Sequence, residues 1–194
     1  MAISILHKKS AEHRARQSFI SLLVAFFLIY TLTASATMEM FLIIDDIKGE
    51  STDVVFPESI EVLSMGWGVS RPDSQSGGGG GLEAINIQDL SMTKAVDQAS
   101  IELLVRAVTG DVIDSALLVV RKVGENPFEY FALELENVMV KSLVMVGSGG
   151  DDQLLENITL NFEKVTTHYR PQNDDGSAGP IKTNCYDVKT SGGC

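Results

Sequence analysis

The sequence predicts a mainly β protein, a small Greek-key β-barrel or sandwich of bent antiparallel strands with one short α-helix. Three observations predict this class. From Met40 onward, short apolar segments alternate with turn residues, as strands and their connections do. Several of these segments change their apolar parity midway, which in a strand requires a bulge or a sharp twist because alternate residues face opposite sides. Apolar residues recur at helical spacing in one stretch after residue 37.

Size and charge limit the classes of protein to consider. At 194 residues, of which 44% are hydrophobic, the chain allows one domain of ordinary size. The net charge is -11, and because residues 1–37 carry four basic residues and one acidic residue, residues 38–194 carry -14. A domain that acidic repels phosphate backbones, so nucleic acid is not expected as a partner.

Residues 1–37 form a segment distinct from the domain expected over 38–194. The basic residues of this segment are Lys8, Lys9, Arg14 and Arg16. They precede an apolar run over 19–32 that ends at Ala34-Ser35-Ala36, an order typical of a signal peptide. The run has 14 residues, fewer than the ~17–25 of a membrane-spanning helix. We favour a cleaved signal over an anchor, and a start of translation at Met38 or Met40 is a third interpretation.

Three strands are predicted in the first half of the domain, over 41–47, 60–69 and 85–92. The first is apolar on both faces at its start, as for a strand covered on two sides, and a turn follows it at 48–51. The second changes parity between Val62 and Leu63, and the third changes parity at Gln88-Asp89. Strong curvature is expected at both positions.

The one predicted helix of the domain begins at Ile101. Apolar residues recur there at helical spacing, at Ile101, Leu104, Val105 and Val108. Asp97 and Ser100 are two candidate caps, and Gly110 is placed to end the helix.

Strands dominate the second half. They are predicted over 115–123, 128–136, 138–146 and 157–169. Parity changes within the last of these, so a bulge is expected near Glu163-Lys164. Residues 170–194 are expected to form a polar linker over 170–179 and then a last edge strand over 181–188.

The segment from Ser70 to Gly81 is longer than a hairpin connection needs. Its candidate site residues are Ser70, Arg71, Pro72, Asp73, Gly77, Gly78, Gly79, Gly80 and Gly81. Five consecutive glycines cannot pack a core, so they indicate a loop, either a disordered surface loop or a docking element. A nucleotide-binding loop is not expected, because the GK[ST] ending that contacts phosphate and magnesium is missing.

No other stretch predicts chemistry, and we expect neither an enzyme nor a cofactor, metal or catalytic site. The only cysteines are Cys185 and Cys194, which lie in the last ten residues, outside any core segment. They predict no disulfide framework and no zinc site. Paired acidic residues are adjacent rather than convergent, so they do not predict general acid–base catalysis.

Several motifs occur together in one order along the chain. They are KGES at 48–51, SMGWG at 64–68, GGGGG at 77–81 and IQDLSMTKAVD at 87–97. Three later segments, LLVVRKVGENPFEYFALELENVMV, GSGGDDQLLENITLNF and YRPQ, continue the series. In this order the motifs resemble the haemolysin-coregulated protein (Hcp) family over about 155 residues.

The resemblance implies the tube subunit of the bacterial type VI secretion system. In that family, homo-hexameric rings stack into a hollow tube inside a contractile sheath, and contraction expels the tube with its spike and effector cargo out of the cell. The loop over 70–81 matches the family's ring-stacking loop. Gly66 matches a position in a strand that lines the lumen, where a glycine offers cargo no side chain. Trp67 is expected to anchor either the barrel wall or the subunit seam.

An alternative of a different class is a secreted β-barrel binding module that does not assemble. It is supported by the signal-like N-terminus, which is unusual for a family whose subunits are drawn from the cytoplasm, and which leaves the delivery route open. The chain also has Cys185-Tyr186-Asp187 where the family commonly shows Gly-Trp-Asp, so the resemblance is weaker in the last strand.

Overall fold

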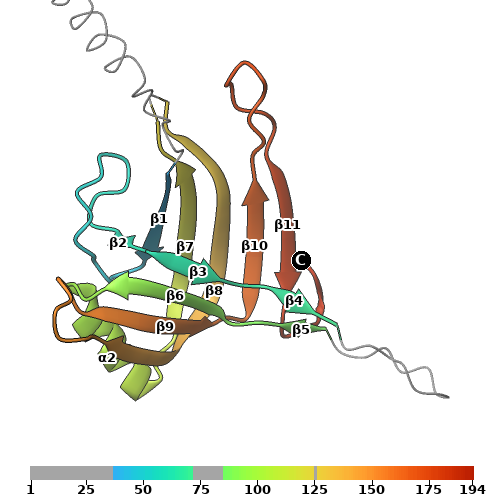
Figure 1. The fold of residues 1–194 in the computed structure, drawn as a ribbon. Helices are drawn as coiled ribbons and strands as arrows, with labels where there is room; N and C mark the ends of the chain where they lie inside the picture. The colour runs from blue at the N-terminus through green and yellow to red at the C-terminus, as the bar shows by residue number, and fades with distance from the viewer. Residues whose placement is uncertain (1–36, 72–84, 125) are drawn as a thin grey trace, which may run out of the picture. The chain divides into compact units, whose positions relative to one another are not determined.

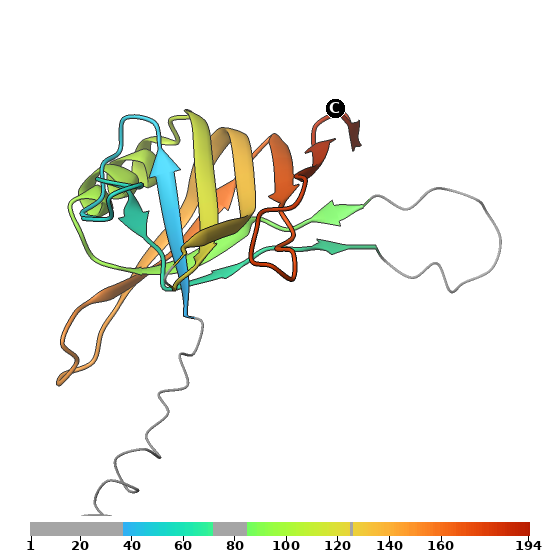
Figure 2. The same ribbon diagram turned by 90° about the horizontal axis from the view of Figure 1, so that it is seen from above.

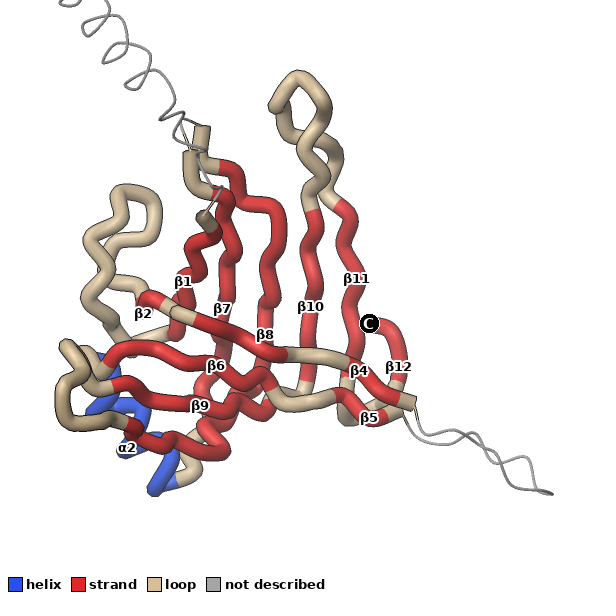
Figure 3. The backbone as a smooth tube through the Cα atoms, viewed as in Figure 1, coloured by secondary structure: helices blue, strands red, loops and turns tan. Residues whose placement is uncertain are grey.

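The computed structural model describes residues 37–71, 85–124 and 126–194. Ala36–Cys194 make up one compact unit. Its described residues form one helix and antiparallel strands, which make up two larger sheets and a separate two-stranded arm, as Figures 1 and 3 show.

We call the larger array sheet A. Its strands follow the order β12 (Gly192–Gly193), β11 (Lys182–Asp187), β10 (Lys164–Tyr169), β8 (Phe128–Val146), β7 (Ile113–Lys122), β1 (Met38–Ile44) and β2 (Ile60–Glu61). We call the smaller array sheet B. It consists of β3 (Ser64–Gly66), β6 (Leu90–Ala95), β9 (Leu155–Asn161) and the C-terminal part of β8. In Figure 3 the strands of sheet B cross in front of those of sheet A.

One long strand belongs to both sheets. β8 has 19 residues, where the sequence predicted two strands separated at Asn137. Its first part pairs with β7 and β10, and residues 139–146 pair with β9. Asn137 takes a positive φ of 53° at the transition, a conformation that asparagine tolerates better than most residues. The prediction of two strands was wrong because Asn137 redirects the chain without ending the strand.

The two sheets meet a second time where the parity change at Val62 and Leu63 predicted a bend. The Val62 amide donates to the Met40 carbonyl of sheet A at 2.9 Å, whereas the Leu63 amide donates to the Thr93 carbonyl of sheet B at 2.8 Å. At this corner no strand of sheet A pairs with a strand of sheet B in the described chain. The two sheets therefore do not close into a barrel. The mainly β class with one short helix in the described part of the chain is confirmed, and the arrangement is two open sheets.

The core lies between the sheets. Its fully buried members include Leu42, Ile60, Leu90, Leu118, Leu133, Leu135 and Leu160. The helix α2 (Ala99–Thr109) contributes Ala99 and Leu103 to the same core. It ends as predicted at Gly110, whose φ of 74° is left-handed and whose amide donates to the Arg106 carbonyl.

α2 begins two residues earlier than the sequence suggested. The Asp97 carboxylate accepts a hydrogen bond from the Ala99 amide at 3.0 Å, so Asp97 satisfies a donor of the first turn. Ser100 lies inside the helix rather than at its cap. Its hydroxyl belongs to a buried polar cluster.

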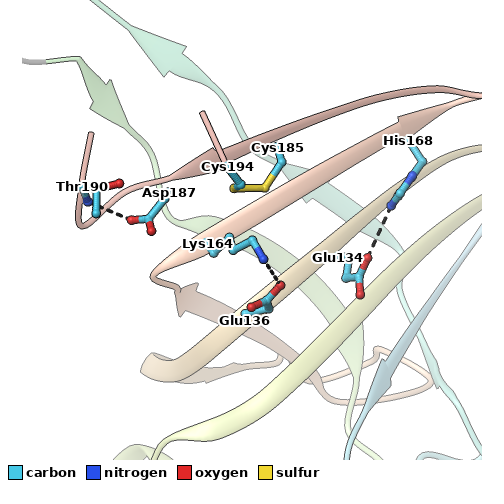
Figure 4. Close-up of a disulfide and its surroundings, with 8 residues drawn as sticks. All are labelled: Glu134, Glu136, Lys164, His168, Cys185, Asp187, Thr190 and Cys194. Atoms are coloured by element: carbon cyan, nitrogen blue, oxygen red, sulfur yellow. Dashed lines mark hydrogen bonds and ion pairs between the residues drawn. A yellow bond between two sulfur atoms is a disulfide. The ribbon is translucent and has the colours of Figure 1, made fainter. Parts of the chain in front are cut away.

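The C-terminal residues fold back on the edge of sheet A. β12 pairs with β11 through Tyr186 and Asp187, and Cys185 and Cys194 form a disulfide across the turn (Figure 4). No local pattern indicated this pair, because the two cysteines are nine positions apart and neither lies in the core. A single disulfide thus forms in a chain for which the sequence predicted no disulfide framework.

Candidate assembly surfaces

Sheet B turns one face to the core and the other to solvent. Along β6 and β9, the side chains of Leu90, Met92, Ile158 and Leu160 are buried. The residues between them face outward and are short and polar without charge. Together with two positions of β3 they form what we call the polar face: Ser64, Gly66, Ser91, Thr93, Asn157 and Thr159.

Cross-strand hydrogen bonds order this face. The Thr93 hydroxyl donates to the Asn157 side-chain oxygen at 2.7 Å, and the Ser91 hydroxyl donates to the Gly66 carbonyl at 3.0 Å. A Cβ atom on Gly66 would lie 3.2 Å from the Ser91 oxygen, so glycine gives Ser91 the room to make this bond. The predicted lumen residue Gly66 thus lies on the polar face.

A charged pair at the border of the polar face is internally neutralised. Lys141 on β8 donates to Asp89 at 2.6 Å, and the Asn161 side chain donates to the same carboxylate at 2.7 Å. Burial opposes ionisation of Asp89, but these two hydrogen bonds outweigh it and lower the pKa of the carboxyl group. The border therefore carries no unpaired charge from either residue.

Sheet B has two strand edges without a partner among the described residues. β3 pairs with β6 on one side. Residues 139–146 of β8 pair with β9 on one side, whereas the side that β7 occupies up to Val138 has no further strand. Unpaired edges are templates for pairing with another strand. Each neighbouring pair in sheet B is antiparallel, so β3 and β8 run in opposite directions.

The candidate loop emerges from a two-stranded arm. β4 (Val69–Ser70) pairs with β5 (Asn86–Ile87), and the arm leads away from β3 and β6, as Figure 2 shows. Ser70 lies at the end of β4 and Arg71 follows it, exposed. The other candidates of this loop, Pro72, Asp73, Gly77, Gly78, Gly79, Gly80 and Gly81, lie outside the described residues.

Trp67 lies between β3 and β4, half-buried and packed against the core cluster. Its indole nitrogen Nε1 is buried and has no hydrogen-bond partner among the residues that the structure places. The side chain therefore acts through the apolar area that it covers rather than through its polar atom.

The sequence reasoning missed a buried ionic cluster beneath sheet B. The Lys94 ammonium group lies 2.7 Å from Glu156 on β9 and 2.7 Å from Asp97, and it donates to the Ser100 hydroxyl at 3.2 Å. The signal was present in the parity of the strands: Lys94 follows Leu90 and Met92 on the inward side of β6, and Glu156 precedes Ile158 on the inward side of β9. Opposite charges at inward positions of neighbouring strands indicate a pair.

A second missed cluster attaches the loop over 45–59 to sheet A. Arg121 on β7 donates to both carboxylate oxygens of Asp53 and to Glu39 on β1. Its guanidinium group lies 4.9 Å from the ring centre of Phe41, which stacks on Phe56 of the loop. The hydrogen bond from Arg121 lowers the pKa of Asp53 to about 2. No local pattern could indicate this cluster, because Asp53 and Arg121 are 68 residues apart.

The outer face of sheet A near the disulfide is also paired (Figure 4). Lys164 and Glu136 lie 2.5 Å apart, and the hydrogen bond that the Lys164 ammonium group donates to the Glu136 carboxylate raises the pKa of Lys164. His168 lies 3.5 Å from Glu134. Within the ranges that the structure covers, no three His, Cys, Asp or Glu side chains are arranged to hold a metal ion, and no helix is long and apolar enough to cross a membrane.

The described residues thus form an antiparallel β protein with two sheets, one short helix and an exposed polar sheet face. Comparison with known proteins identifies the family within this class. A family model described as "Type VI secretion system effector, Hcp" matches residues 41–169. The chain belongs to this Hcp family of type VI secretion proteins, a family of structural and secreted proteins.

Individual relatives agree with this assignment. Protein hcp1 of Pseudomonas aeruginosa is 44% identical over 149 residues, which cover 75% of this chain and 92% of that protein. Hcp1 from Salmonella typhimurium has a similar structure, with a TM-score of 0.66 and 30% identity over 81% of this chain and 99% of that one. A solved type six secretion system protein gives a TM-score of 0.76 at 28% identity and covers 81% of this chain and all of that one.

Proposed function

We propose that this protein is a structural subunit of the type VI secretion tube. Six copies form a ring, rings stack into a hollow tube, and contraction of a surrounding sheath expels the tube with its spike and effector cargo. No catalysis is involved in this role. Membership of the Hcp family supports the proposal, and the observation that carries it is the pair of open edges on sheet B.

The edges are suited to a ring because of their strand directions. When a second copy is placed beside the first in the same orientation, its β3 lies against residues 139–146 of β8. The two strands run antiparallel, because the four strands of sheet B alternate in direction. β3 of each copy then pairs with β8 of the next copy, which is a heterologous contact. Such contacts form a closed ring when the rotations between successive copies add up to one full turn.

The polar face is suited to line the lumen of such a ring. Continuation of sheet B from copy to copy would join six polar faces into one wall. The short hydroxyl and amide side chains of β3, β6 and β9 can hydrogen-bond to water and bring no unpaired charge to this wall, and at the β8 edge Val144, which pairs with Asn157 and is 54% exposed, adds an aliphatic side chain to it. Gly66 adds no side chain to this wall, so selection of cargo falls to its neighbours Ser91, Thr93 and Asn157.

The loop over 70–81 is proposed to dock on the next ring. The β4–β5 arm, from which the loop continues, leads away from β3 and β6, and a glycine-rich segment contributes little to a core yet adapts readily to a neighbouring surface.

Electron microscopy of purified residues 38–194 tests the proposal. We expect ring-shaped particles with a central hole in end-on views, and stacked rings at high protein concentration. Particles of monomer size alone, at the highest concentration that stays soluble, would contradict the tube and would favour the secreted binding module.

A further inference from the structure

The helix α2 is apolar on both of its faces. Its inner face contributes Ala99 and Leu103 to the core. Its outer face carries four aliphatic side chains that are largely exposed: Ile101 at 65%, Leu104 at 40%, Val105 at 52% and Val108 at 80%. We call these four residues the outer stripe. A helix that is hydrophobic all round is normally buried, and a contiguous exposed apolar patch usually marks an interaction site.

The outer stripe leads toward the open edge of sheet B. α2 contacts β8, as Figure 3 also shows. After the helix, Val112, which is 50% exposed, precedes Ile113, the residue that pairs with Val138. Beyond Val138 the β8 edge has no strand partner in the described chain, and Met145 of this edge, which pairs with the inward-facing Glu156 and therefore lies on the helix side of the sheet, is 42% exposed. Exposed apolar side chains thus extend from the helix to the edge.

The opposite edge of sheet B carries a matching apolar side. In β3, Ser64 and Gly66 face the polar side of the sheet. Leu63 and Met65 have the other parity and face the side on which α2 lies, and Trp67 packs on that side too. Leu63 is 53% exposed, although it lies beside the core. When β3 of one copy lies along β8 of another, Leu63 comes to the helix side of the joined sheet.

We propose that the outer stripe of α2 in one copy covers Leu63 and its neighbours at the β3 edge of the next copy. The occupant is a second copy of this chain, because both surfaces flank the two edges that repetition of sheet B brings together. This inference rests on the proposed ring and assigns α2 a role within it. α2 covers the contact between the two copies on the side of the joined sheet away from the polar face. Each subunit then packs its own α2 on one neighbour and is covered by the α2 of the other neighbour.

A matched pair of valine substitutions tests the role of the helix. Val108→Glu places a charge on the outer stripe, and Val54→Glu makes the same change on the loop over 45–59, where Val54 is 95% exposed. Light scattering of the full chain over a dilution series reports the mass of the assembly. We expect Val108→Glu to raise the concentration at which rings dissociate by about tenfold or more, and Val54→Glu to behave like the wild type. Both variants should keep the wild-type melting temperature of the subunit.

The outcomes separate this inference from the proposed ring. Rings in the wild type with equal behaviour of Val108→Glu and Val54→Glu would overturn the role of α2 and leave the ring intact. A wild type that stays monomeric would overturn the ring itself.

Chemical cross-linking tests the contact directly. In the doubly substituted variant Val108→Cys/Leu63→Cys, a short bis-maleimide should join neighbouring copies into a ladder of covalent oligomers. The control Val54→Cys/Leu63→Cys should give no such ladder. The native cysteines do not interfere, because Cys185 and Cys194 are joined to each other. Rings that give no ladder with the first variant would overturn the inference.

Discussion

Lys94 and Glu156 form an ion pair beneath sheet B, with 2.7 Å between Nζ and Oε1 and side chains that are 1% and 0% exposed. The Ser100 hydroxyl donates to the same Glu156 oxygen at 2.9 Å, and Asp97 accepts from the same ammonium group. Because Asp97 and Ser100 lie at the start of α2, this cluster attaches the helix to β6 and β9. It therefore fixes the helix whose outer stripe we assign to the seam.

Lys94→Met is expected to lower the free energy of unfolding by about 3–5 kcal/mol, because it leaves the Glu156 carboxylate buried without its cation. The control Lys48→Met removes an exposed ion pair with Glu58 and should change stability by less than about 0.5 kcal/mol. Urea denaturation measures both. The double variant Lys94→Met/Glu156→Leu should recover part of the loss, since no buried charge of the pair remains. Equal effects of Lys94→Met and Lys48→Met would show that the pair is dispensable.

The Asp53–Arg121 pair predicts acid sensitivity of the loop over 45–59. The hydrogen bond from Arg121 depresses the pKa of Asp53 from 3.8 to about 2. Its contribution to stability is therefore complete above pH 3.8 and is lost as the pH falls toward 2. Asp53→Asn should lower the melting temperature at pH 7, and its deficit should shrink between pH 4 and pH 2. A deficit that stays constant over this range would mean that the ionised pair contributes nothing.

Trp67→Ala is expected to destabilise the subunit itself by about 3 kcal/mol, because the half-buried ring packs against the core of its own chain. Trp67→Phe should cost much less, since it keeps an aromatic ring and removes a nitrogen that makes no hydrogen bond in the described structure. Thermal unfolding and ring mass are measured together. A normal melting temperature with dissociated rings would place Trp67 at the seam alone.

Shortening the loop by removal of Gly77–Gly81 should leave the ring intact and weaken the stacking of rings. Because glycine has no side chain to pack in a core, the melting temperature should not change, whereas a shorter loop should reach less of the next ring. Electron microscopy compares the lengths of tubes formed by the wild type and by the shortened chain. Tubes of normal length from the shortened chain would remove the loop from ring stacking.

Much of the fold could be predicted because local patterns report local geometry. The parity change at Val62 and Leu63 marks the corner between the sheets, and the change at Gln88-Asp89 marks the break between β5 and β6. Gly110 ends α2 through its left-handed backbone. These features depend on neighbouring residues, which a single sequence displays directly.

Features that depend on pairing over long distances could not be predicted in this way. The continuity of β8 through Asn137 follows from its three partner strands rather than from its own residues. The Arg121 cluster requires the register of β1 against β7 and the path of a distant loop. The Cys185–Cys194 disulfide depends on the turn that follows β11, which short polar residues do not specify. The open edges of sheet B likewise appear only once every strand has its partners assigned.

The mass of the assembled particle tests the central claim most directly. Size-exclusion chromatography with light scattering on residues 38–194 should give a species of about six times the subunit mass, as a closed ring requires. The same species should persist over dilution until the seam dissociates. A particle of subunit mass at every concentration would contradict the ring, the tube and the role assigned to α2.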